Sequence, residues 1–159
     1  MSYKATWAFD LLAQGQLPKE DHDEILQDPQ ACFLLQTIPG VGKLLSLVLL
    51  YEIHTIERFP TVGDFLSYAR LVTPKHTSDG KVTGQSGAKI GNPHLKWAFS
   101  EAGLMMLRYS EDAQQFLARK EKKHGKSRAM TMLARKIART VYYMLKRKEA
   151  FDAVKFFAS

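Results

Sequence analysis

The chain has 159 residues, 45% of them apolar, which is enough for one folded domain with a buried core. Its longest apolar run, Leu44 to Tyr51, is too short to span a bilayer, and the N-terminus lacks the pattern of a secretory signal. The net charge of +7 and the single cysteine, Cys32, favour a cytoplasmic protein with a polyanionic partner over a secreted, disulfide-bonded or membrane protein.

Residues 1–30 are expected to form a short acidic helical appendage. Two lysines and six acidic residues precede position 41, so the basic excess lies entirely beyond this region. We recognise no chemistry in these residues, and we place the boundary of the main domain at residues 31–159.

Residues 33–53 have the pattern of a helix-hairpin-helix. The turn between the two helices reads Ile38-Pro39-Gly40-Val41-Gly42, followed by Lys43 and a strongly apolar helix. In such a hairpin, Gly40 and Gly42 leave backbone N–H groups open to a phosphate, and Lys43 adds a positive charge. An ordinary helical hairpin with a Pro-Gly turn is the alternative.

A further helix is predicted from Val62 to Leu71, with Thr61 as its N-cap. The next segment, residues 73–92, holds four glycines, two serines and three lysines. A loop of this length is usually functional or disordered, and it reads either as a phosphate-facing loop with a nucleophilic serine or as a surface linker. The residues that would carry the first function are Ser78, Ser86, Lys81 and Lys89.

Asn92 and Pro93 have the residue types of an N-cap and a first helical turn, and they predict a helix through about Arg108. Lys89 and Lys96 flank its start, where unpaired N–H groups favour an anion. A loop serine delivered to this point would meet a place suited to a phosphate.

Two more helices are predicted, over 111–123 and over about 127–148, followed by a short apolar tail. Apolar residues of the long basic helix recur every three or four positions and should face the core. Arg128, Arg135 and Arg139, with Lys146, share another stripe that could contact a nucleic-acid backbone. With no convincing strand in the chain, the predicted fold class is all-α.

Together these motifs resemble the C-terminal domain of the insertion-sequence transposases of the one-ten, one-sixteen and nine-oh-two group. The resemblance covers about Phe33 to Phe157. It is carried by the following segments: Leu34-Leu-Gln-Thr-Ile-Pro-Gly-Val-Gly-Lys43, Ile56-Glu-Arg-Phe-Pro60, Ser78-Asp-Gly-Lys81, Gly84-Gln-Ser-Gly87, Lys89-Ile-Gly-Asn92, Leu95-Lys-Trp-Ala-Phe-Ser-Glu-Ala102 and Ala138-Arg-Thr-Val-Tyr-Tyr-Met-Leu-Lys-Arg147.

The resemblance implies DNA transposition by a serine nucleophile that attacks a DNA phosphodiester. By position Ser78 is that nucleophile, and Ser86 is a phosphate-positioning residue or the reserve nucleophile. It also implies a structured bridge RNA as a partner and Mg²⁺ held by the acids of an N-terminal RNase-H-like domain. The 32 residues before Phe33 cannot hold that domain, so we expect a truncated chain that binds no metal itself and is inactive alone.

The resemblance further implies a bacterial, nucleoid-associated protein of the cytoplasm, with no membrane partner; self-association into a homo-oligomer is left open. The alternative function is a non-catalytic helix-hairpin-helix module that binds nucleic acid through Gly40, Gly42, Lys43 and the basic helix. A purely structural helical protein would leave the glycine-serine segment and the charge asymmetry unexplained.

Overall fold

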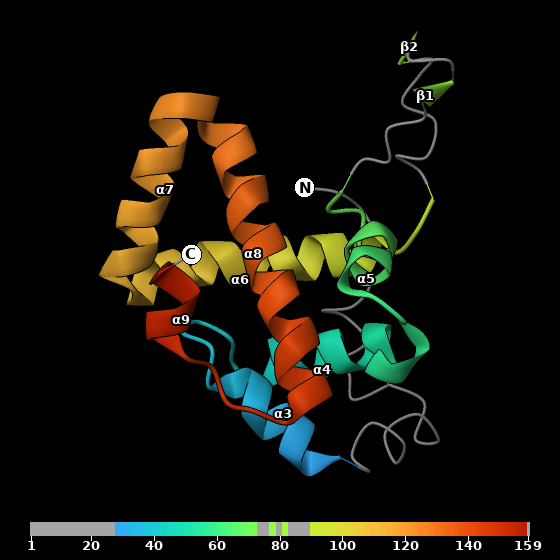
Figure 1. The fold of residues 1–159 in the computed structure, drawn as a ribbon. Helices are drawn as coiled ribbons and strands as arrows, with labels where there is room; N and C mark the ends of the chain where they lie inside the picture. Colours follow the sequence, from blue (N-terminus) through green and yellow to red (C-terminus); the bar gives the residue numbers. More distant parts are fainter. Residues whose placement is uncertain (1–27, 73–76, 79–80, 83–89, 159) are drawn as a thin grey trace.

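The computed structural model describes residues 28–72, 77–78, 81–82 and 90–158, and it confirms the all-α fold class (Figure 1). The predicted appendage, residues 1–30, lies almost entirely outside the described residues. The elements are α3 (Pro29–Gln36), α4 (Lys43–Ile53), the short 3₁₀ helix η1 (Ile56–Arg58), α5 (Val62–Tyr68), β1 (Thr77–Ser78), β2 (Lys81–Val82), α6 (Pro93–Tyr109), α7 (Glu111–His124), α8 (Lys126–Arg147) and α9 (Ala153–Ala158).

Side-chain caps start several of these helices where the sequence predicts them. Thr61 and Asp64 form a reciprocal capping box at α5, in which each side chain accepts a hydrogen bond from the other residue's backbone N–H. The Asn92 side chain accepts hydrogen bonds from the backbone N–H groups of His94 and Leu95, at 2.8 and 3.1 Å, and Pro93 occupies the first turn of α6. Both predicted helix starts are confirmed.

The core lies where α8 crosses α6, with α3, α4 and α5 packed around the crossing (Figure 1). α7 and α8 run antiparallel and meet at Gly125, which ends the first helix and precedes the second. The side chains at the centre are fully buried aromatic and aliphatic groups, among them Phe65, Phe99, Met106, Leu133 and Ile137. Burying such side chains is the main term that stabilises the helices against the unfolded chain.

The turn between α3 and α4 packs directly on the backbone of α6. Gly40 has a φ of +86°, and a Cβ at this position would lie 2.5 Å from the carbonyl carbon of Met105 and 2.7 Å from the nitrogen of Met106. Only glycine permits this combination of backbone conformation and close approach. A Cβ on Gly42, by contrast, would have no atom of the described residues within 4 Å.

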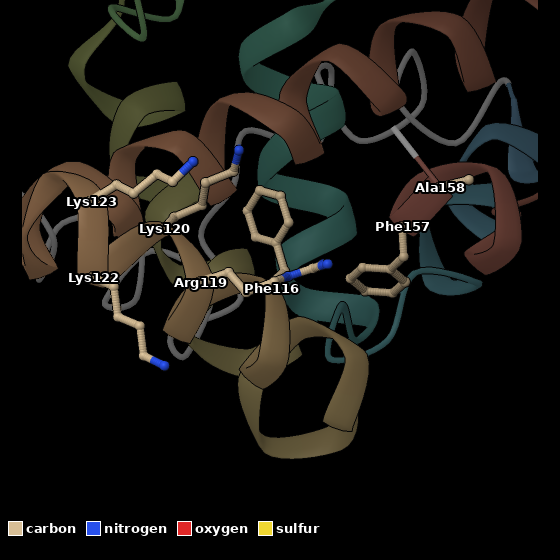
Figure 2. A pocket seen from close by; sticks show the side chains of 7 residues that line it. All are labelled: Phe116, Arg119, Lys120, Lys122, Lys123, Phe157 and Ala158. Carbon is tan, nitrogen blue, oxygen red and sulfur yellow. The ribbon is translucent and has the colours of Figure 1, made fainter.

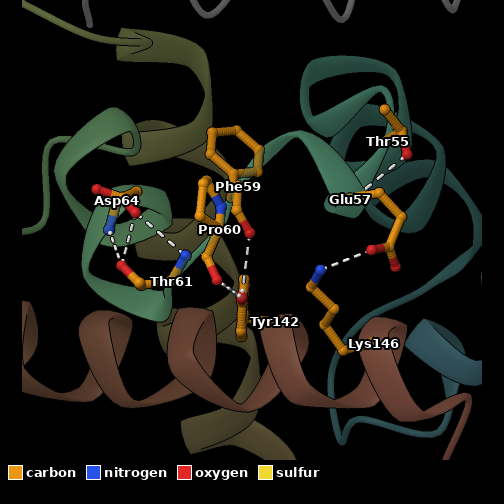
Figure 3. A network of polar contacts seen from close by, with 8 residues as sticks. All are labelled: Thr55, Glu57, Phe59, Pro60, Thr61, Asp64, Tyr142 and Lys146. Atoms are coloured by element: carbon orange, nitrogen blue, oxygen red, sulfur yellow. Dashed lines mark hydrogen bonds and ion pairs between the residues drawn. The ribbon is translucent and has the colours of Figure 1, made fainter.

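The Ile56–Pro60 motif joins η1 and α5 to α8 (Figure 3). The Tyr142 hydroxyl donates to the carbonyls of Phe59 and Pro60, at 3.1 and 3.3 Å. The Lys146 ammonium pairs with the Glu57 carboxylate at 2.7 Å. A motif that the resemblance singled out therefore has a structural role, and Tyr142, which is 5% exposed, packs in the core.

Two local features differ from the prediction. The apolar tail contains a helical turn, α9, with Phe156 buried. In addition, β1 and β2 form an antiparallel hairpin of two residues each, with Ser78 opposite Lys81. The two residues between these strands in the sequence are Asp79 and Gly80, a pair typical of tight hairpins, and this signal was missed.

Candidate nucleic-acid interface

One face of α8 carries a stripe of arginines. Arg128, Arg135 and Arg139 are spaced by seven and four residues, which places them on the same side of the helix, and all three are exposed. Within the part of the chain that the structure describes, neither Arg128 nor Arg135 forms an ion pair with an acid. We call these three residues the arginine stripe; it presents positive charge to solvent along α8.

Lys146 lies on the same stripe by spacing, but its ammonium group already has an acidic partner. Its ammonium pairs with Glu57, and its side chain is 25% exposed. The hydrogen bond that the Lys146 ammonium donates to the Glu57 carboxylate raises the pKa of Lys146 above its ordinary value. This residue therefore fastens η1 to α8 and differs in role from the three arginines.

The N-terminus of α4 is open to solvent. Gly42 is the N-cap, no side chain of the described residues caps the helix, and both Gly42 and Lys43 are exposed. Their backbone N–H groups and the lysine ammonium could therefore receive an anion. Gly40 instead faces the backbone of α6, so its strict requirement for glycine follows from packing. The phosphate contact of the helix-hairpin-helix stays a prediction.

The structure describes only part of residues 73–92, which we call the serine segment. Ser78 lies in β1, and Lys81 in β2 pairs with it through the backbone. Ser86 and Lys89 lie outside the described residues, as do the side chains of Ser78 and Lys81. Lys96 is exposed on the first turns of α6. The nucleophile and the phosphate contacts predicted in this segment stay predictions.

The two ends of the serine segment are held side by side. The backbone N–H of Asn92 donates to the carbonyl of Tyr68 at 2.6 Å, and the Asn92 side-chain amide donates to the Glu52 carboxylate at 2.6 Å. Gly91 lies at the same contact with a φ of +108°, and a Cβ there would come within 2.5 Å of the Tyr68 carbonyl oxygen. Glu52, Tyr68, Gly91 and Asn92 thus clamp the segment, and no local sequence signal pairs residues so far apart.

A second basic cluster, which no local sequence pattern predicts, lies between α7 and α8. The Lys136 ammonium is 5.2 Å from the ring centroid of Phe116, and the Lys120 ammonium is 5.5 Å from the same centroid. Partial burial lowers the pKa of Lys136, and the nearby charges of Lys120, Arg139 and Arg119 lower it further. Only the packing of α7 on α8 reveals this crowding of cations.

The described residues offer no metal site and no membrane span. Among them, no three His, Cys, Asp or Glu side chains gather so as to hold a metal ion. None of the helices in the described ranges is both long and apolar enough to cross a membrane.

Comparison with known proteins identifies the family. The model of the transposase IS116/IS110/IS902 family matches residues 32–118, more than half of the chain. The chain belongs to this transposase family. The matched residues run from α3 into α7 and include the serine segment, whereas the arginine stripe on α8 lies beyond them.

The chain is also similar to the transposase for insertion sequence element IS1111A of Coxiella burnetii (strain RSA 493 / Nine Mile phase I). The two sequences are 25% identical over 137 residues, which cover 84% of this chain but 38% of that transposase. The chain therefore spans well under half the length of this relative.

Proposed function

We propose that the chain is the C-terminal, DNA-contacting part of an insertion-sequence transposase. The observation that carries this proposal is the arginine stripe, three exposed cations on one face of α8 in a chain of a transposase family. Lysine and arginine side chains that neutralise phosphates release counterions, which drives binding to DNA without reading its sequence. The stripe therefore fits the backbone of a DNA duplex.

In the proposed reaction, the Ser78 hydroxyl oxygen attacks a DNA phosphorus atom. One phosphodiester bond breaks, a phosphoserine ester forms, and the oxygen of the leaving strand takes up the proton. The clamp of Glu52, Tyr68, Gly91 and Asn92 supports this role, because it fixes where the serine segment leaves and re-enters the helical body. The positive charges of Lys81, Lys89 and Lys96 would hold the phosphate, and Ser86 is the reserve nucleophile.

A serine hydroxyl is a weak nucleophile unless a base or a metal activates it. The described residues do not fit a divalent metal, so we derive no metal-dependent step for this chain alone. We expect Mg²⁺ on the acids of an RNase-H-like domain and a bridge RNA that selects the DNA, both outside the 159 residues described by this sequence. By itself the chain is expected to bind DNA and to leave it uncut.

The test is a covalent adduct. The chain is mixed with the acidic domain of a full-length relative, its bridge RNA, Mg²⁺ and end-labelled element DNA, and the products are separated on denaturing gels. We expect a protein–DNA adduct that disappears in Ser78→Ala and survives in Ser86→Ala. An adduct that persists in Ser78→Ala and disappears in Ser86→Ala would transfer the nucleophile to Ser86.

The second candidate function is a non-catalytic nucleic-acid-binding module. It is favoured by the open N-terminus of α4, where Gly42 and Lys43 are exposed. If no adduct forms under any condition while Lys43→Gln weakens DNA binding in a folded protein, this function replaces the first. The readout separates the two because binding and adduct formation are measured independently.

A further inference from the structure

A pocket of about 480 Å³ opens between α7 and α9 (Figure 2). The described residues that line it are two phenylalanines, four cations and one alanine, with no acid among them: Phe116, Phe157, Arg119, Lys120, Lys122, Lys123 and Ala158. Its lining therefore combines aromatic rings with positively charged side chains. That combination suits a ligand with a flat apolar part and an anionic part.

Packing against neighbouring side chains holds the aromatic part of the pocket in place. Phe116 is 5% exposed and belongs to the core, whereas Phe157 is half-buried and reaches the pocket surface. The Phe157 ring packs edge-on against buried Phe156, with centroids 4.8 Å apart and planes at 87°. This contact holds the ring in place, so it can serve as a stacking platform at a small further cost in side-chain entropy.

The cationic part is crowded. In Figure 2 the guanidinium of Arg119 lies between the Phe116 and Phe157 rings, while the Lys122 side chain points away from both. Lys136 approaches from α8, 5.2 Å from the Phe116 centroid and 5.3 Å from the Phe156 centroid. Several like charges held this close repel one another, and an anion bound among them would relieve that repulsion.

We propose that this pocket binds an unpaired nucleotide of a DNA strand, with the base stacked on Phe157 and the phosphate held by Arg119, Lys120 and Lys123. This inference rests on the proposed function, because strand exchange exposes unpaired DNA. Positively charged grooves with aromatic platforms are the usual way in which proteins hold single strands. A base inside a duplex stacks on its neighbours and cannot lie against Phe157.

The experiment uses fluorescence anisotropy with a labelled ten-nucleotide oligothymidylate, a labelled 20-base-pair duplex and a labelled ten-nucleotide oligouridylate. Phe157→Leu keeps an apolar side chain and removes the ring. It is expected to weaken oligothymidylate binding by at least about fivefold and to leave duplex binding unchanged. Phe33→Ala, which removes an exposed ring on α3 (69% exposed), is the aromatic control and should change neither.

A matched pair on α7 tests the charge. Arg119→Gln and Lys122→Gln each remove one positive charge from the same helix, but only the Arg119 side chain lies between the rings in Figure 2. We expect Arg119→Gln to weaken oligothymidylate binding several-fold more than Lys122→Gln. Thermal melts check that each variant is folded, and Phe157→Met replaces Phe157→Leu if the latter is not.

The outcomes separate this inference from the proposed function. If folded Phe157→Leu binds oligothymidylate as tightly as the wild type does, the pocket assignment is overturned. The proposed function would still stand in that case, provided that the wild-type chain binds the duplex. If the wild-type chain binds oligothymidylate but not the duplex, this result counts against the proposed function and leaves the pocket assignment intact. Binding of oligouridylate more than about tenfold tighter than oligothymidylate would assign the pocket to RNA and overturn the DNA strand as its ligand.

Discussion

Two glycines that are equivalent in the sequence motif have different surroundings in the structure. Gly40 combines a left-handed backbone with van der Waals contact to the backbone of α6, whereas Gly42 has an ordinary φ of −84° at an open helix start. Any substitution at Gly40 therefore adds backbone strain and forces α4 and α6 apart. At Gly42 a Cβ would meet no atom of the described residues within 4 Å.

We expect Gly40→Ala to lower the free energy of unfolding by at least about 2 kcal/mol, since both strain and displacement of α6 contribute. Gly42→Ala should lower it by less than about 1 kcal/mol, the usual range for an N-cap change. Urea unfolding followed by circular dichroism measures both. Equal effects of the two changes would contradict the close approach at Gly40.

At the scale of the element, α8 is divided between structure and surface. One side supplies buried core residues, the C-terminal part holds η1 through Tyr142 and Lys146, and the arginine stripe remains exposed. Lys136 lies between these regions, facing α7 and α9. The helix can therefore lose its stripe charges without losing its packing.

Changing Arg128, Arg135 and Arg139 together to Gln should weaken duplex binding and flatten its salt dependence by about one unit of slope per lost phosphate contact. Glutamine keeps helix propensity close to that of arginine, so folding should be retained. The control removes the same charge from exposed residues off the stripe, namely Arg108, Lys148 and Lys155. Anisotropy titrations at several salt concentrations give the slopes, and equal slopes for the stripe variant and wild type would refute the stripe.

The crowded charge of Lys136 predicts a pH dependence of stability. Burial, with Lys120, Arg139 and Arg119 nearby, lowers its folded-state pKa below the ordinary 10.5. The unfolded chain then binds more protons between the two pKa values, so the free energy of unfolding should gain a positive increment as pH rises through this window.

Lys136→Met should remove that increment, so the difference in stability between wild type and variant should change in favour of wild type as the pH rises towards 10.5. The raised pKa of Lys146 has the opposite effect on stability, but it is present in both proteins and cancels. Urea unfolding at each pH measures the difference. A pH-independent difference would contradict the assigned lowering.

At the scale of the whole molecule, helix packing joins the half of the chain that precedes the serine segment to the half that follows it. α3, α4, η1 and α5 precede the segment, and α6 to α9 follow it. α6 packs on α4, while α8 packs on α3, α5 and η1, so the core belongs to both halves. The peptide connection through residues 73–89 therefore holds the two halves together in addition to these packing contacts.

A chain with a protease site in place of residues 83–88 should therefore stay assembled after cleavage. We expect the two fragments to elute together from a size-exclusion column at the volume of the uncut chain and to separate in denaturant. The control is a chain cut at a site inserted between α7 and α8 at Gly125, where the short fragment contains only α8 and α9. Separation of the 83–88 fragments in native buffer would contradict a core shared across the segment.

The sequence by itself determined most of the helices, because their signals are local. Apolar spacing, the Thr61 cap, the Asn92-Pro93 start and the Gly125 stop each depend on a few neighbouring residues. The arginine stripe also follows from spacing, since residues of one helix share a face whatever the rest of the chain does. The resemblance to a transposase family, carried by motif order, was confirmed by the family match.

Only the tertiary structure decided which of these residues are free to act. Gly40 packs on α6, Lys146 pairs with Glu57, and Glu52 meets Asn92 from forty residues away. The pocket at Phe157 exists because α9 returns to α7. Such contacts join positions distant in sequence, and their energies depend on three-dimensional packing that no local pattern encodes.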